Sequence, residues 1–145
     1  MTNNPIEKTV LLPFPAASIY NLVERIEDYP GFLPWCAKTE VDRSEADAIR
    51  ATVKIDYLGI RQSFTTRNRH TASSRIDMVL LDGPFTALDG CWLFHELRDD
   101  ACKVEFSLDY TMRSGLFGRA MAPVFGKISA SMVDAFVNEA HKRYG

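Results

Sequence analysis

The sequence predicts an α+β protein in which a curved antiparallel sheet of six to seven strands wraps around one long C-terminal helix. Three observations predict this class. Apolar residues alternate with polar ones through much of the region from 37 to 110, which is the period of strands with one buried face. A long apolar stretch at helical spacing follows from about Phe117 to Tyr144. A helical pattern near the start completes the order, and we expect two short helices after the first strand.

The bulk composition is that of a soluble globular protein, and we expect a single domain over residues 1–145. The chain is 46% hydrophobic and 25% charged, and its net charge of -2 gives no general attraction to nucleic acid or anionic lipid. Cys36, Cys91 and Cys102 are odd in number and widely spaced, which argues against a disulfide framework. The first residues lack a signal-peptide pattern. We therefore expect a cytoplasmic protein, with peripheral contact at the inner face of the membrane as an open alternative.

The N-terminal region predicts a strand followed by a helix. Glu7 to Leu12 fits a strand that ends at Pro13 and Pro15. Proline near the start of a helix costs little, so a helix can begin at about Ala16. Its apolar residues share one face at helical spacing: Ile19, Leu22, Val23 and Ile26.

Strict alternation then indicates antiparallel strands. It is clearest from Ala51 to Tyr57 and from Lys103 to Tyr110. Further strand-like runs lie near 61–70, 75–82 and 86–97, with a weaker one near 37–45. Turn signals separate these runs near 44–47, 58–59, 72–74 and 98–100.

The last stretch, Phe117 to Tyr144, predicts a helix on the order of 40 Å long. It is apolar over so wide an arc that the sheet must enclose most of it. Pro123 should kink this helix or mark its true start, because proline cannot donate to the carbonyl of Arg119. A concave sheet and a convex helix do not mate perfectly, so we expect a cavity between them.

Two aromatic strings lie in segments rich in proline and glycine. The first covers residues 28–35, and the second joins residues 82–85 with 90–94. Loops are usually polar, so large rings held in tight turns suggest the lining or lid of an apolar pocket. The alternative is that Phe32, Trp35 and Phe85 close the ends of an ordinary core.

These strings and the order of elements resemble the START-like helix-grip superfamily, which is related to polyketide cyclases and dehydrases. The resemblance rests on Asp-Tyr-Pro-x-Phe-Leu-Pro-Trp at 28–35, Asp-Gly-Pro-Phe at 82–85 and Gly-x-Trp-x-Phe at 90–94, and it covers nearly the whole chain. More narrowly, the chain is similar to the coenzyme Q-binding branch, which includes bacterial ribosome-association toxins. The resemblance implies an isoprenoid quinone as bound ligand, with a carrier or chaperone role in respiration. It equally allows a translation inhibitor that blocks association of the ribosomal subunits.

A quinone cavity would draw its wall from the strings, the strands and the long helix. Methionine and phenylalanine on the helix would give an adaptable surface for a prenyl tail. If Phe64 points inward, Gln62, Thr66 and Asn68 do so too, and they can hydrogen-bond quinone or phenol oxygens. A register error of one residue would turn them to solvent instead. The apolar candidates are Phe32, Trp35, Phe64, Phe85, Trp92, Phe94, Phe106, Tyr110, Met121, Phe125, Ile128 and Met132.

The best candidates for an RNA contact are Arg61, Arg67 and Arg69, which would share the outer face of one strand. Phosphate contacts need such a patch. The alternative is a solvated strand face, since Asp77 and other carboxylates can lie beside it.

No recognisable catalytic constellation appears in the sequence. His95-Glu96 lacks the second histidine of a zinc helix, and no Cys-x-x-Cys, phosphate loop or dinucleotide fingerprint is present. Cys36 lies between Trp35 and Ala37, with no basic residue next to it, and is expected to be inert. His70, His95 and His141 are widely separated, so we expect each to be replaceable by alanine. We therefore expect no metal and no enzyme activity, with a cyclase-like enzyme as the third alternative.

Overall fold

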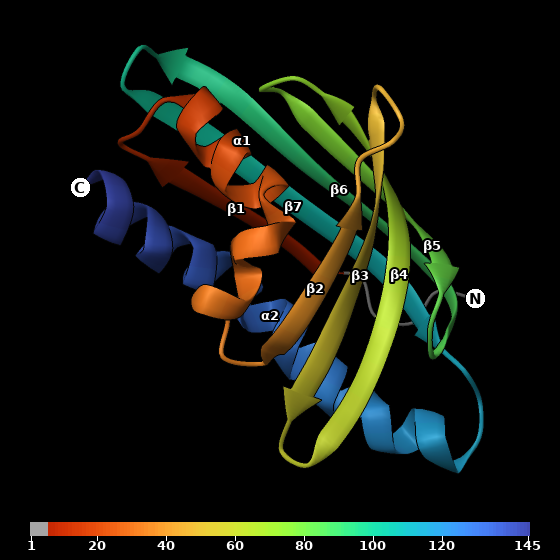
Figure 1. The fold of residues 1–145 in the computed structure, drawn as a ribbon. Helices are drawn as coiled ribbons and strands as arrows, with labels where there is room; N and C mark the ends of the chain where they lie inside the picture. Colours follow the sequence, from red (N-terminus) through yellow and green to blue (C-terminus); the bar gives the residue numbers. More distant parts are fainter. Residues whose placement is uncertain (1–5) are drawn as a thin grey trace.

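The computed structural model describes residues 6–145, in which one seven-stranded antiparallel sheet wraps around a long helix (Figure 1). The order of elements confirms the predicted α+β class. Both short helices follow the first strand, the second of them as a 3-10 helix, η1. The elements are β1 (Ile6–Leu12), α1 (Ala16–Glu24), η1 (Ile26–Gly31), β2 (Cys36–Asp42), β3 (Ala48–Tyr57), β4 (Ile60–Thr71), β5 (Arg75–Asp82), β6 (Phe85–Arg98), β7 (Ala101–Met112) and α2 (Leu116–Tyr144).

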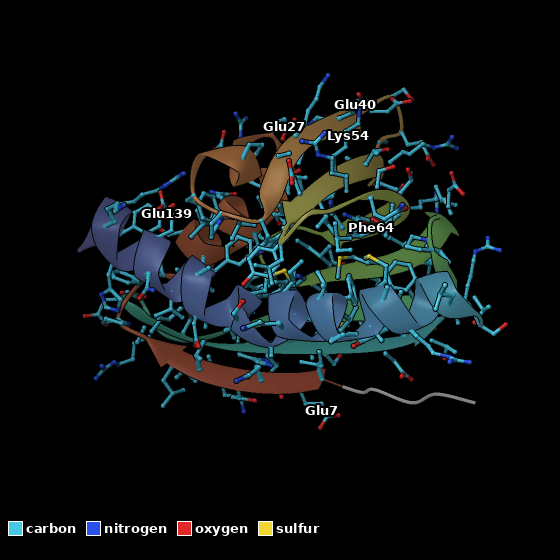
Figure 2. All side chains as sticks on the ribbon, turned by 90° about the horizontal axis from the view of Figure 1, so that it is seen from below. Glu7, Glu27, Glu40, Lys54, Phe64 and Glu139 are labelled. Atoms are coloured by element: carbon cyan, nitrogen blue, oxygen red, sulfur yellow. The ribbon has the colours of Figure 1, made fainter. Side chains whose placement is uncertain are left out.

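The strands lie in the order β1-β7-β6-β5-β4-β3-β2, and all neighbours are antiparallel. Strands β2 to β7 follow one another through hairpins, while β1 pairs with β7 and extends the far edge. Helices α1 and α2 contact each other, and α1 contacts β6 and β7. Seen from below, the sheet curves around α2, which crosses its concave side (Figure 2). This arrangement places the predicted core between α2 and the inner face of the sheet.

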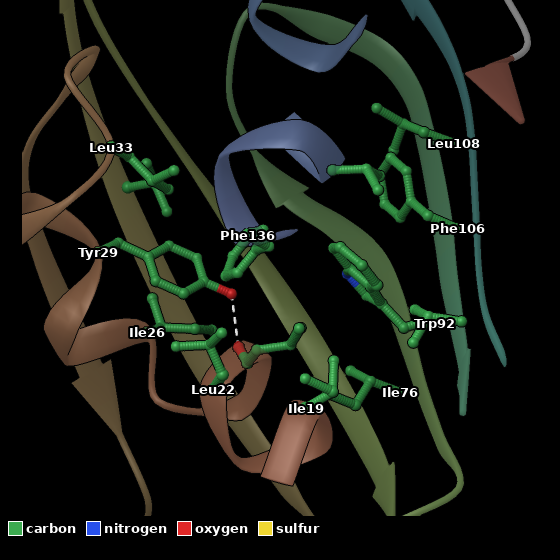
Figure 3. Packing of buried hydrophobic residues seen from close by; sticks show 14 of the residues in the cluster. Ile19, Leu22, Ile26, Tyr29, Leu33, Ile76, Trp92, Phe106, Leu108 and Phe136 are labelled. Carbon is green, nitrogen blue, oxygen red and sulfur yellow. Dashed lines mark hydrogen bonds between the residues drawn. The ribbon is translucent and has the colours of Figure 1, made fainter. Parts of the chain in front are cut away.

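The inner face is built by the alternation that the sequence shows. On β7, Val104, Phe106 and Leu108 are buried while the residues between them are more exposed. Aromatic rings then join the sheet to α2, because Trp92 lies 4.5 Å from Phe106 and 5.4 Å from Phe136 between ring centroids (Figure 3). Such ring pairs stabilise a core beyond the area that they bury.

Helix α2 begins at Leu116, so Pro123 lies inside the helix and does not mark its start. The first turn folds back on the end of β7, where a Cβ at Gly118 would lie 1.7 Å from the carbonyl oxygen of Arg113. Only glycine allows this approach. Residues Gly118–Tyr144 also have the length and hydropathy of a membrane span. Here that hydropathy serves the buried face of the helix, which packs on the sheet.

The turn between β3 and β4 has an unusual composition. Tyr57 pairs with Ile60, so Leu58 and Gly59 form a two-residue turn, with φ values of 52° and 81°. Asn-Gly is the common choice for such a turn. A leucine with positive φ costs about 1–2 kcal/mol. Leu58 is also 72% exposed, so neither the backbone conformation nor solvation favours a leucine at this position.

Candidate functional site: a cavity between the long helix and the sheet

A cavity of about 80 Å³ lies between α2 and the inner face of the sheet. Its wall is almost entirely apolar, and the end of α1 with η1 forms one side of it. Seven of the twelve apolar residues predicted from the sequence line this cavity: Trp35, Phe64, Trp92, Phe106, Phe125, Ile128 and Met132.

The other five predicted residues do not line this cavity, which corrects the predicted wall. Phe94 lies behind Trp92 with its ring stacked at 6.1 Å, and Met121 is buried beyond the cavity in the first half of α2. Phe32 packs on Phe136 and is covered by the Arg143 guanidinium 5.5 Å from its ring. The remaining two, Phe85 and Tyr110, belong to a ring cluster described next. Phe85, Phe94 and Tyr110 belong to the hydrophobic core, Phe32 packs against it, and Met121 is fully buried.

Two clusters of aromatic rings pack beside the cavity. Phe64, Phe85, Tyr110 and Phe125 form a four-ring cluster with centroids 4.7–6.1 Å apart, around the first half of α2. The other cluster comprises Tyr29, Phe32, Trp92 and Phe136, at 5.2–6.0 Å. Each aromatic string therefore contributes some residues to the cavity wall and others to core packing. Neither the pocket-lining interpretation nor the ordinary-core interpretation holds for a whole string.

A polar stripe on β4 crosses the apolar wall. Thr66 and Asn68 point inward as predicted, and the Thr66 hydroxyl donates to Oδ1 of Asn68 at 2.7 Å. Ser129 lines the cavity from α2 and is 2% exposed. Because Oδ1 of Asn68 accepts from Thr66, the amide NH₂ is the part of Asn68 that can donate to a ligand. The stripe can therefore bind an oxygen-bearing ligand, and this remains a prediction.

Gln62 does not belong to the polar stripe. It lies near the start of β4, half-buried beside a surface hollow that Ala37 and Lys54 also line. The strand alternation placed it on the inner face correctly, but the cavity ends before this position. The prediction of Gln62 as a cavity contact is therefore wrong.

The predicted residues omit one side of the wall, which Val23, Ile26 and Tyr29 form, although Tyr29 belongs to the aromatic string at 28–35 that predicted a lining or lid. The Tyr29 hydroxyl donates to the carbonyl oxygen of Val23 (Figure 3), and burial raises the pKa of Tyr29 above its ordinary value. His70 was also missed, although it has the same strand parity as Thr66 and Asn68. That parity could have identified His70, and the aromatic string at 28–35 could have identified Tyr29, whereas no local pattern placed Val23 and Ile26 at the cavity.

His70 joins the cavity to a group of charges. Its Nδ1 lies 3.9 Å from Oε2 of Glu24, and burial lowers the pKa of His70 although Glu24 opposes this shift. Arg43 hydrogen-bonds both Glu24 and Glu27, and it lowers the pKa of Glu27. Arg43 therefore ties the β2–β3 connection to the end of α1 and to η1.

We expect the wild-type protein to lose thermal stability as the pH falls below about 6.5 and the unfolded chain takes up protons. The pKa of His70 is lower in the folded protein than the 6.5 of a free imidazole, so the unfolded chain binds more protons in this window. The contribution is complete above that pH and is lost below it. His70→Gln should flatten this part of a plot of Tm against pH, while the exposed control His141→Gln keeps it. Equal slopes in all three proteins would contradict this origin.

The remaining histidines lie away from the cavity. His95 donates to the Glu105 carboxylate on the outer face, and His141 packs edge-on against Phe14 at 5.1 Å. Although the three histidines are far apart in sequence, His70 and His95 each lie beside a carboxylate, Glu24 and Glu105 respectively. Burial raises the pKa of the Cys36 thiol to about 11, which makes it a poor nucleophile. Within residues 6–145, no group of three or more His, Cys, Asp or Glu side chains is arranged to hold a metal ion.

The three predicted arginines do share the outer face of β4, but two of them form ion pairs with neighbouring carboxylates. Arg67 pairs with Glu45 at 2.7 Å, and Arg61 pairs with Asp56 at 3.5 Å. In the described part of the chain, Arg69 forms no ion pair. Asp77 lies opposite it on β5, and the pKa of Asp77 is lowered mainly by its hydrogen bond from Arg75, with a smaller contribution from the charge of Arg69. This face carries both signs of charge, which is typical of a solvated sheet surface.

The family model described as polyketide cyclase / dehydrase and lipid transport matches residues 12–137. The chain belongs to this family. Among solved structures, the Zhui aromatase/cyclase from Streptomyces sp. R1128 has a TM-score of 0.86 at 17% identity, over 100% of this chain and 97% of that one. This likeness confirms the helix-grip fold of the family and concerns the fold alone.

Curated relatives of this chain are named either for ribosome association and persistence or for coenzyme Q binding. The chain is 40% identical over 139 residues to the persistence and stress-resistance toxin PasT of Escherichia coli O6:H1, covering 96% of this chain and 88% of that protein. It is 36% identical over 140 residues to the ribosome association toxin RatA of Pseudomonas aeruginosa, covering 97% of each. Identity falls to 24% with the coenzyme Q-binding protein COQ10 homolog B of Xenopus laevis, over 93% of this chain and 57% of that one.

Proposed function

We propose that this protein associates with the ribosome and interferes with the joining of its subunits. The observation that carries this proposal is the 36% identity over 97% of both chains to a ribosome association toxin. The similarity to the coenzyme Q-binding relative is weaker. The toxin alternative is therefore better supported than the quinone carrier, and it implies a cytoplasmic location.

The small size of the cavity also favours ribosome association over the role of a quinone carrier. A water molecule needs about 10–15 Å³ of such space, so the 80 Å³ cavity has room for roughly five to eight waters. Pockets for drug-sized ligands are on the order of 300–1,000 Å³. A prenylated quinone would therefore need α2 to move away from the sheet.

For contact with ribosomal RNA, Arg69 is a better candidate than its neighbours. Arg61 and Arg67 would have to give up Asp56 and Glu45 before they could bind phosphate. Arg69 is exposed and has no ion pair within residues 6–145. Phosphate binding by Arg69 therefore breaks no ion pair, although Asp77 lies opposite it on β5.

The test is a sucrose-gradient measurement with purified subunits and purified protein. We expect added protein to lower the fraction of joined ribosomes and to sediment with a subunit. In a plot of the logarithm of the binding constant against the logarithm of salt concentration, Arg69→Gln should reduce the magnitude of the slope by about one. The matched control is Lys142→Gln, an exposed cation at the end of α2, which should leave the slope unchanged. An unchanged joined fraction at excess protein would contradict the proposal, and equal slopes in both variants would exclude the role of Arg69.

A second candidate function is the binding of a small aromatic ligand inside the cavity. The polar stripe on β4 favours it together with Ser129 on α2, because Thr66, Asn68 and Ser129 place hydrogen-bonding groups in an otherwise apolar wall. A quinone or phenol head group matches this combination of a flat apolar ring and oxygen atoms. For the third alternative, a cyclase-like enzyme, His70 is the cavity-lining side chain that can exchange a proton near neutral pH.

A further inference from the structure

Two leucines project into solvent from one end of the molecule. Leu116 is 83% exposed at the start of α2, and Leu58 is 72% exposed in the β3–β4 turn. Figure 1 shows this turn and the first turn of α2 at the same end, the lower one in that view. The β5–β6 turn lies between them in the order of the sheet: a Cβ at Gly83 would lie 2.7 Å from Cβ of Phe64 on β4, and the Gly83 carbonyl accepts a hydrogen bond from Arg113 after β7. We call this surface the leucine end.

The backbone conformation of Leu58 is a second observation, independent of its exposure, that indicates a contact outside the chain. Its φ of 52° is unfavourable for a branched side chain, and asparagine would suit this turn better. Its side chain also remains in contact with water. Unfavourable conformations of this kind persist where function requires the side chain. The leucine is therefore more readily explained by a contact outside the chain than by the stability of the hairpin.

The charge of the leucine end differs from that of the whole molecule. From Tyr110 to Val133 the sequence has Arg113, Arg119 and Lys127 and no carboxylate, in a chain of net charge -2. Arg119 and Lys127 are exposed, and neither forms an ion pair within residues 6–145. Two carboxylates lie near this end: Asp82, the last residue of β5, and Asp56, which pairs with Arg61. The end is thus positive and apolar together.

We propose that the leucine end docks on the surface of an anionic lipid bilayer. Leucine side chains enter the interfacial region of a bilayer, while nearby cations meet the anionic head groups. An RNA partner accounts for the cations but not for the leucines, because leucine has neither a ring for base stacking nor a hydrogen-bonding group. This surface is separate from Arg69 on β4, so the proposal does not depend on ribosome binding.

The experiment measures sedimentation of the purified full chain with vesicles of two parts phosphatidylcholine and one part phosphatidylglycerol. The test variant is Leu58→Asn with Leu116→Ser, and asparagine at 58 suits the turn, so the hairpin stays folded. The matched control is Leu11→Ser with Leu97→Ser, because these leucines are 69% and 53% exposed and lie on β1 and β6, away from the leucine end. Thermal melting establishes that all proteins are folded.

We expect the wild type to bind these vesicles, and to bind less at about 1 M salt or without phosphatidylglycerol. The test variant should lower the partition coefficient by at least about tenfold, and the control should stay within about twofold of the wild type. Wild-type protein that does not sediment with anionic vesicles would overturn the proposal, as would equal losses in both variants. If the test variant instead loses ribosome binding and keeps vesicle binding, this end contacts the ribosome and the lipid proposal is wrong.

Discussion

Trp92→Ala is expected to lower the free energy of unfolding by about 3–5 kcal/mol, the largest effect on stability that we predict for a single substitution. Trp92 is 3% exposed and joins the sheet to the long helix. Its ring contacts Phe106 and Phe94 on the sheet and Phe136 on α2. Alanine would remove these contacts and extend the cavity, which a packed wall of rings cannot fill by small movements. The measurement is denaturant unfolding followed by circular dichroism.

Two further variants make this result specific. Trp92→Phe keeps an aromatic ring and should cost less than Trp92→Ala. Leu97→Ala removes a side chain that is 53% exposed, and it should change the stability by no more than about 0.5 kcal/mol. A loss below about 1 kcal/mol for Trp92→Ala would contradict the assignment of Trp92 to the centre of the core.

The orientation of side chains on the strands was predictable because it depends on the pleat alone. Successive residues of a strand point to opposite faces, so fixing Phe64 inward fixes Thr66 and Asn68 inward as well. The same parity placed Arg67 and Arg69 outside. The long helix was predictable for a similar reason, because its wide apolar arc requires an enclosing surface.

The depth of each residue along the cavity was not predictable. Trp92 and Phe94 share a strand and a face, yet Trp92 lines the cavity and Phe94 does not. The difference depends on where α2 crosses the curved sheet, and no local pattern encodes that crossing. The same limit explains Gln62, which has the correct parity but lies beyond the end of the cavity.

Contacts between distant segments set the remaining wall. Val23 and Ile26 reach the cavity because η1 follows α1 closely, and Arg43 fixes both elements through Glu24 and Glu27. These partners lie 19 and 16 residues from Arg43 in sequence. Periodicity over a few residues cannot reveal such pairs. The aromatic strings identified the family correctly, but family membership does not fix function, so the choice between ribosome association and quinone binding depends on the relatives and on experiment.

Ile128→Trp is expected to abolish binding of a small quinone in the cavity while leaving ribosome association unchanged. Ile128 is 3% exposed and lines the cavity from α2, where a larger ring would occupy the space that a ligand needs. Accommodating the ring should cost roughly 1–3 kcal/mol of stability. A benzoquinone without a prenyl tail is the probe, and its binding is measured by calorimetric titration. The volume-conserving control is Ile128→Leu, which should keep binding.

The complementary variant reverses charge outside the cavity. Arg67→Glu with Arg69→Glu should weaken a salt-sensitive ribosome interaction, because phosphate attraction depends on surface charge, and it should leave quinone binding unchanged. Loss of ribosome association in Ile128→Trp, with the protein still folded, would show that the two functions are coupled through α2 and would contradict their separation. Quinone binding that survives in Ile128→Trp would exclude the cavity as the ligand site, because its 80 Å³ cannot hold both rings.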